Sequence, residues 1–244
     1  MNPQGSERIP ARLAAWAWIV HAFTATGAVL AFLALMAILE EKWSLALLWL
    51  LAALAVDGID GSLARWARTR EFAPRIDGDT LDLIIDYLNY VFVPLVLIWR
   101  AELVPPSLAP YLAALILVSS LYCFTRRDLK TEDNYFRGFP ALWNVVAFYF
   151  LVARPGEWAG AIAVCAFAAL TFAPVHFLHP FRVLDYGRWP PLLALIWVAA
   201  TAALLWPGLS DGVRTVWLSV SLAVATLLLA LGLLRTVRGS RSVD

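Results

Sequence analysis

Eight apolar runs separated by short polar segments constrain the fold of this chain more than any other feature. A helix needs about 20 mostly apolar residues to cross the ~30 Å hydrocarbon layer, because lipid offers no partner for unpaired backbone groups. The runs are 13–39, 44–64, 80–99, 107–125, 140–153, 158–178, 190–207 and 213–234, of which the fifth is the shortest. We therefore expect an all-α, polytopic transmembrane bundle of about eight helices, with residues 1–244 forming a single integral membrane domain.

The composition excludes a water-soluble globule. The chain is 61% hydrophobic and 15% charged, with a mean hydropathy of +0.73, whereas soluble domains are roughly 45–50% apolar and about 25% charged. The two cysteines, Cys123 and Cys165, lie inside apolar runs and indicate no disulfide framework. The run 13–39 is longer than the ~7–15 residue core of a signal peptide, so we expect a retained helix.

The basic residues predict the orientation. Cytoplasmic loops of membrane proteins carry an excess of Lys and Arg. With the amino terminus inside and eight crossings, 15 of the 19 basic residues fall on the cytoplasmic side. The four on the other side are Lys42, Arg100, Arg154 and Arg214. This asymmetry predicts that both termini are cytoplasmic.

Six aspartates gather between residues 57 and 86. Asp57 and Asp60 are three residues apart, and Asp82 and Asp86 are four apart, so each pair lies on one face of its helix. Ionisable groups beside membrane helices are costly and usually mark a site that faces a polar cavity. The other two members, Asp77 and Asp79, precede the third run and are expected to cap it or to be solvated.

Four carboxylates brought together repel one another unless cations compensate. Oxygen ligands with no nearby His or Cys favour Mg²⁺, Mn²⁺ or Ca²⁺ over zinc, and two divalent ions would balance the four charges and bridge a diphosphate. Gly58, Gly61 and Gly78 leave room here for a ligand or another backbone to approach closely.

The same residues resemble a family signature. The pattern Asp57-x-x-Asp60-Gly61-x-x-Ala64-Arg65, followed by Gly78-x-x-x-Asp82-x-x-x-Asp86, looks like that of the CDP-alcohol phosphatidyltransferases. Residues 66–77 separate its halves, a longer spacer than in the broader family but similar to the bacterial phosphatidylcholine synthase branch. The segments DGIDGSLAR, GDTLDLIIDYLNYVFVP, YFRGFPALWN and HFLHPFRV also resemble that branch, so the likeness extends over about 55–185.

The resemblance implies a reaction and roles for individual residues. CDP-diacylglycerol and choline would give phosphatidylcholine and CMP, at a cytoplasm-facing site in the inner membrane. Asp57, Asp60, Asp82 and Asp86 would hold two divalent ions, Mn²⁺ or Mg²⁺, with Asp86 as the candidate general base. Gly61, Ala64 and Arg65 would line the CDP pocket, and Gly78 would allow close packing there. The expected partners include membrane lipid and no nucleic acid, and a homodimer is compatible with this reading.

Choline is a quaternary ammonium ion that aromatic faces recognise. We expect at least one of Tyr87, Tyr135 and Trp143 to touch its methyl groups, although packing explains any one of them as well. Arg126, Arg127 and Arg137 are equally compatible with lipid phosphate binding and with topology. The histidines His21, His176 and His179 lack the further ligands of a zinc site.

Other functions remain open from the sequence. Serine, inositol phosphate or glycerol phosphate are alternative acceptors within the same family. Intramembrane prenyltransferases also pair two acidic motifs, but those motifs lie in distant halves of the chain, whereas 21 residues separate Asp60 from Asp82 here. Ion-coupled transporters commonly show internal repeats with sites near the midplane, and this chain has neither a visible repeat nor midplane acidic pairs.

Overall fold

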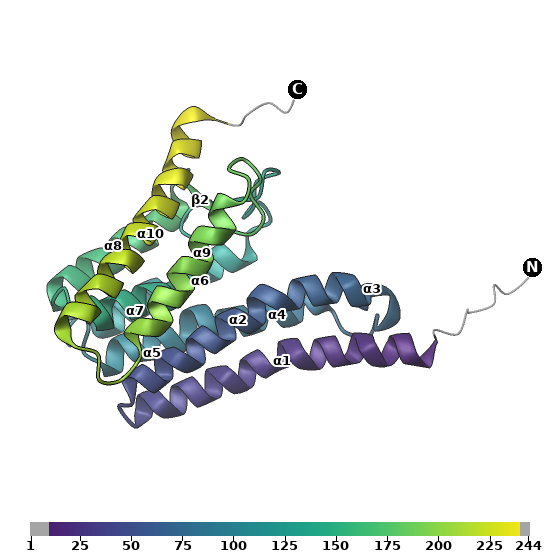
Figure 1. The fold of residues 1–244 in the computed structure, drawn as a ribbon, viewed down its shortest axis with the longest axis horizontal. Helices are drawn as coiled ribbons and strands as arrows, with labels where there is room; N and C mark the ends of the chain where they lie inside the picture. The colour runs from purple at the N-terminus through teal and green to yellow at the C-terminus, as the bar shows by residue number, and fades with distance from the viewer. Residues whose placement is uncertain (1–9, 240–244) are drawn as a thin grey trace, which may run out of the picture.

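The computed structural model describes residues 10–239 as a bundle of helices with one small sheet (Figure 1). The first half contains α1 (Ala11–Leu39), α2 (Trp43–Ala67), α3 (Thr69–Phe72), α4 (Gly78–Asp86), the π-helical segment η1 (Tyr87–Phe92) and α5 (Val93–Arg100). The second half contains α6 (Ala109–Thr125), β1 (Tyr135–Arg137), α7 (Trp143–Ala153), α8 (Glu157–Phe172), β2 (His176–Leu178), α9 (Trp189–Leu204) and α10 (Asp211–Arg238). Arg8 and Arg241, which contribute to the orientation prediction, lie outside the described residues.

Each predicted apolar run contains a helix, but the helices differ in length. Within residues 10–239, four are long and apolar enough to cross a membrane: α1, α2, the continuous helix Gly78–Arg100 and α10. The apolar helices α6, α7, α8 and α9 are shorter. The 11 residues of α7 rise about 17 Å, well short of the hydrocarbon thickness. The mostly helical architecture with several candidate membrane spans is confirmed. That all eight runs cross the membrane completely stays a prediction.

The structure corrects two predicted run boundaries and adds a short two-stranded sheet to the predicted helical bundle. The run 140–153 becomes helical only at Trp143, and the run 158–178 stops being helical after Phe172. Ala173 is extended and precedes Pro174, a position at which the proline ring disfavours helical backbone. The chain then forms β2, which pairs antiparallel with β1 so that Phe136 faces Phe177.

Small residues allow the first helices to approach closely. Buried alanines line the contact between α1 and α2, among them Ala31, Ala34 and Ala46. On α1, a Cβ added to Gly27 would lie 2.5 Å from Cγ2 of Ile85 on α4. Helices in lipid associate through such close packing, because lipid tails supply no hydrophobic drive between them. The two aspartate-bearing helices are therefore held beside α1 by shape.

The third long helix contains a π-helical turn directly after its aspartates. The segment η1 spans Tyr87–Phe92 and is followed by Pro94 near the start of α5. Proline has no backbone N–H and its ring crowds the carbonyl four residues earlier, which widens or breaks the regular helical pattern. Single π-helical turns are frequently found at functional sites, and this one adds Asn89 and Tyr90 to the wall of the aspartate cavity.

The small sheet ties two loops to α10. A Cβ added to Gly232 of α10 would clash with the backbone carbonyl of His176 on β2, so the helix packs directly against the strand. Beside this contact, Nε of Arg235 donates to Oδ2 of Asp133 at 2.7 Å. The α6–α7 loop and the α8–α9 loop are therefore held together at one end of the bundle.

The outer surface and the termini fit a membrane setting. Large apolar side chains are exposed along the helices, including Phe32, Val118 and Ile162, as is expected where lipid takes the place of water. In Figure 1 the described N-terminal and C-terminal ends both project away from the α1–α2 and α9–α10 turns.

Candidate metal and substrate site

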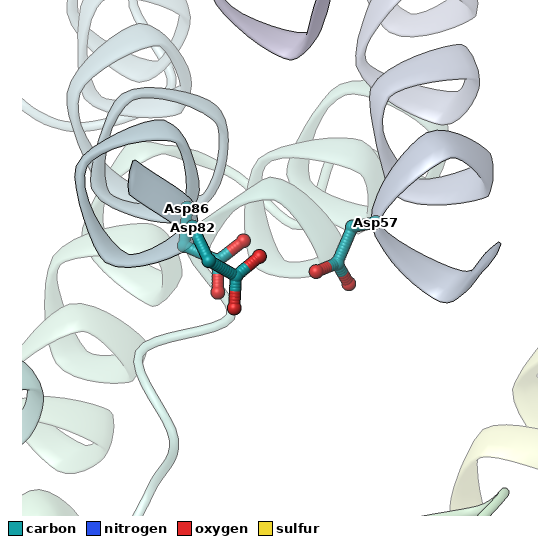
Figure 2. Close-up of side chains that lie close together, drawn as sticks. All are labelled: Asp57, Asp82 and Asp86. Carbon is teal, nitrogen blue, oxygen red and sulfur yellow. The ribbon is translucent and has the colours of Figure 1, made fainter. Parts of the chain in front are cut away.

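The aspartate pairs meet across two helices. Asp57 lies on α2, and Asp82 and Asp86 lie one turn apart on α4. One carboxylate oxygen from each of the three lies within 4.8 Å of the others. Figure 2 shows Asp82 and Asp86 projecting from their helix towards Asp57. The predicted convergence of the two helices is therefore present in the structure for these three residues.

Asp60 lies in the same cavity but outside that group of three. It is 6% exposed and lines the cavity together with Thr24 of α1. Because Asp57 and Asp60 are three residues apart, their side chains diverge slightly around α2, and Asp60 turns further towards α1. The structure thus brings three of the four predicted ligands together and places the fourth on the adjoining wall, where its role as a ligand stays a prediction.

Two residues from η1 complete the cavity, and the sequence analysis assigned neither to the metal site. The hydroxyl of Tyr90 donates to Oδ2 of Asp57 at 2.5 Å. Asn89 is 3% exposed, and its Nδ2 donates to the carbonyls of Gly27 at 3.0 Å and Ile85 at 3.1 Å. For Tyr90 the sequence contained a signal of this position. Tyr90 follows Asp86 by four residues and therefore lies on the same helical face.

The donor set fits a hard divalent cation. Three carboxylates converge, and the buried Oδ1 of Asn89 has no hydrogen-bond partner among the described residues. Oxygen donors of this kind suit Mg²⁺, Mn²⁺ and Ca²⁺, while a zinc or copper site would draw on imidazole or thiolate ligands. A cation here would also offset the mutual repulsion of the carboxylates.

The predicted nucleotide-binding residues lie near the end of α2 and at the start of α4. A Cβ added to Gly61 would lie 3.6 Å from Nη1 of Arg65 and 3.8 Å from Nη2 of Arg182. Ala64 is half-buried on the same part of α2. At the start of α4, a Cβ on Gly78 would lie 3.1 Å from Cε1 of His21, so Gly78 permits close packing of α4 on α1. Contact of these residues with CDP stays a prediction.

The three aromatic candidates for choline have different surroundings. Trp143 is fully buried, and its indole Nε1 donates to Oγ of Ser120 at 2.8 Å. Tyr135 is also fully buried, and its hydroxyl donates to Oδ2 of Asp185 at 2.9 Å. Tyr87 is half-buried and packs edge-to-face against Phe124. Of the three, Tyr87 has the most accessible ring, directly after Asp86 in the chain.

The remaining charged candidates are mostly paired. Nε of Arg126 donates to Oδ1 of Asp128 at 2.9 Å, and Nη1 of Arg137 lies 3.5 Å from the other oxygen of that carboxylate.

Asp77 is the N-cap of α4 and accepts from the backbone N–H groups of Asp79 and Thr80. The Thr80 hydroxyl and these amides lower the pKa of Asp77. The cap prediction for Asp77 is confirmed, and Asp79 pairs with Arg70 at 2.5 Å.

Comparisons with known proteins agree with this geometry. The model of the family described as CDP-alcohol phosphatidyltransferase matches residues 18–175. The phosphatidylcholine synthase of Pseudomonas aeruginosa is 46% identical over 78% of this chain and 79% of its own length. Those of Mesorhizobium japonicum and Bradyrhizobium diazoefficiens are 40% and 45% identical, over 78% and 74% of this chain and 70% and 67% of their own.

Proposed function

The chain belongs to the CDP-alcohol phosphatidyltransferase family, and we infer that it catalyses phosphatidylcholine synthesis. The phosphatidyl group passes from CDP-diacylglycerol to the hydroxyl of choline, and CMP leaves. The observation that carries this conclusion is the juxtaposition of Asp57, Asp82 and Asp86 in a chain 46% identical to a phosphatidylcholine synthase.

The residues of the cavity divide the chemical work. A primary alcohol is a weak nucleophile and needs a base within hydrogen-bond reach. Asp86 accepts the choline hydroxyl proton, the alcohol oxygen bonds to the phosphatidyl phosphorus, and the bond from that phosphorus to the CMP oxygen breaks. Asp57, Asp60 and Asp82, with Asp86, would hold the divalent cations, Mn²⁺ or Mg²⁺, and these would neutralise diphosphate charge.

The site faces the cytoplasm of the bacterial inner membrane, and both termini lie on that side. The support is the concentration of 15 of 19 basic residues on one predicted set of loops. This orientation lets CMP leave into water while the acyl chains stay in lipid. A homodimer stays a prediction.

The acceptor alcohol is tested by CMP release. Purified protein in nanodiscs, given CDP-diacylglycerol and Mn²⁺, is expected to release CMP with choline at least about tenfold faster than with serine, inositol phosphate or glycerol 3-phosphate. Chelation by EDTA should stop the reaction, and added Mn²⁺ should restore it. A faster reaction with one of the other acceptors would reassign the substrate within the family, and CMP release without any acceptor would indicate hydrolysis instead.

Tyr87 is the best placed of the three aromatic candidates for choline. Tyr87→Leu is expected to raise the KM for choline by about two- to thirtyfold, since a cation over an aromatic face contributes roughly 0.5–2 kcal/mol, while the KM for CDP-diacylglycerol changes little. Tyr111→Leu is a control, because Tyr111 is exposed at the opposite end of the bundle. An unchanged choline KM would remove Tyr87 from the site.

A further inference from the structure

Two arginines from distant parts of the sequence meet above the aspartate cavity. Guanidinium nitrogens of Arg65, on α2, and Arg182, in the α8–α9 loop, both lie within 3.8 Å of the Cβ position of Gly61. Gly61 directly follows Asp60, so this meeting point adjoins the cavity wall. Two guanidinium groups near one point raise the positive potential there, which favours an anion beside them.

Lys130 adds a third positive charge from the α6–α7 loop. Its Nζ lies 5.2 Å from the centre of the Phe136 ring, and His179 stacks on that same ring at 5.5 Å. Desolvation and then the charge of Arg182 lower the pKa of Lys130, while Asp82, Asp86 and Asp57 act in the opposite direction. Lys130 is therefore within electrostatic range of both Arg182 and the carboxylate cluster.

Arg65, Lys130 and Arg182 have no acidic partner among the described residues. Within residues 10–239, no carboxylate lies within 4.0 Å of the charged nitrogens of Arg65, Lys130 or Arg182, whereas Arg126, Arg137 and Arg235 each have an aspartate. The Nη2 of Arg65 donates only to Oγ of Ser62, at 2.9 Å. A set of unneutralised cations beside a charged cavity has the chemistry of an anion site.

His179 is neutral at the edge of this set. Burial and, to a smaller extent, the charges of Arg182 and Lys130 lower its pKa to about 4. Its Nδ1 accepts a hydrogen bond from the backbone N–H of Phe181 at 3.3 Å, which orients the ring within the same loop that carries Arg182. The loop is therefore ordered around the cations without contributing a fourth charge.

We propose that Lys130 and Arg182, together with Arg65, form an anion subsite that binds the diphosphate of the nucleotide-activated lipid beside the aspartate cavity. This inference rests on the proposed function for the identity of the ligand. A diphosphate beside carboxylates needs positive charge near its outer oxygens as well as near the oxygens that face the cavity. The two loops joined by β1 and β2 carry Lys130 and Arg182, which supply that positive charge. Of the arginines for which lipid phosphate binding and topology were left as equal alternatives, Arg126, Arg127 and Arg137, the first and the last are paired with Asp128.

The test uses the full chain in nanodiscs of neutral lipid, with CDP as a soluble diphosphate probe. Lys130→Gln combined with Arg182→Gln is expected to weaken CDP binding, measured by calorimetry with Mn²⁺ present, and to raise the KM for CDP-diacylglycerol, each by roughly ten- to a hundredfold. The KM for choline should stay within about twofold. Arg75→Gln combined with Arg188→Gln removes the same charge from the same predicted membrane face and should leave CDP binding unchanged.

The outcomes separate the possibilities. Equal CDP affinity in the wild type and the Lys130/Arg182 variant overturns the subsite, as does an equal loss in the Arg75/Arg188 variant. A loss that occurs only in nanodiscs containing an anionic lipid assigns the cations to lipid headgroups and also overturns it. If the wild type binds CDP but releases no CMP with choline, the proposed function fails while the diphosphate subsite is still decided by the binding data.

Discussion

Asp86→Asn is expected to lower kcat for phosphatidyl transfer by about 10²- to 10⁴-fold, the range that a positioned general base contributes. Asparagine keeps the size of the side chain and one oxygen donor, but it does not accept the proton of the alcohol. Since Asp57 and Asp82 supply the other carboxylates of the cluster, Mn²⁺ binding should weaken far less than turnover. CMP release measures turnover, and electron paramagnetic resonance of bound Mn²⁺ measures the site directly.

Asp79→Asn is the matched control for that experiment. Asp79 lies on the same helix, is exposed, and pairs with Arg70 outside the cavity, so its loss should leave both kcat and Mn²⁺ affinity within about twofold. A near-normal rate in the Asp86 variant would exclude Asp86 as the base. A parallel collapse of Mn²⁺ binding and turnover would instead make Asp86 a ligand whose main task is to hold the cation.

Asp57→Asn is expected to weaken Mn²⁺ binding by at least about tenfold and to reduce turnover at fixed Mn²⁺ at least as strongly. Asp57 is the only member of the group of three on α2, so no neighbouring carboxylate on that helix is as close to Asp82 and Asp86. Loss of a charged ligand from a cation site removes both attraction and charge balance. Excess Mn²⁺ should recover part of the activity, which separates weakened binding from a misfolded protein.

Tyr90→Phe tests the predicted cation site through the hydrogen bond that Asp57 accepts. The Tyr90 hydroxyl donates to Oδ2 of Asp57, so its removal should lower Mn²⁺ affinity by a smaller factor of about three to ten while leaving the fold intact, in line with the loss of a hydrogen bond to a charged group. Unchanged Mn²⁺ binding in the Asp57 variant would contradict the assignment of Asp57 as a ligand, whatever its effect on rate.

Local patterns predicted the features that depend on one helix at a time. The three- and four-residue spacings of the aspartates predicted which side chains share a face, and the position of Asp77 before an apolar run predicted its capping bonds. The same reasoning failed at Phe172, where a run of apolar residues continues into a strand. Hydropathy does not distinguish helix from strand over a few residues, and Pro174 was the local signal for the change.

The choline candidates show where such patterns stop being informative. Tyr135, Trp143 and Tyr87 are all expected near the cytoplasmic face from the sequence, yet two are fully enclosed and bonded to Asp185 and Ser120. Aromatic residues are common in this chain, and their burial depends on which distant elements pack over them. Composition and spacing carry no information about that.

The sequence by itself determined the membrane architecture, the pairing of aspartates on two neighbouring helices and the family, because hydrophobic length and residue spacing are properties of single segments. Only the tertiary structure decided that Asp60 is set apart from the other three aspartates, that Tyr90 holds Asp57, and that Arg65 and Arg182 both approach Gly61. These relations join segments as much as 117 residues apart, from Arg65 to Arg182. Their geometry depends on helix packing and on the small sheet that brings two loops together.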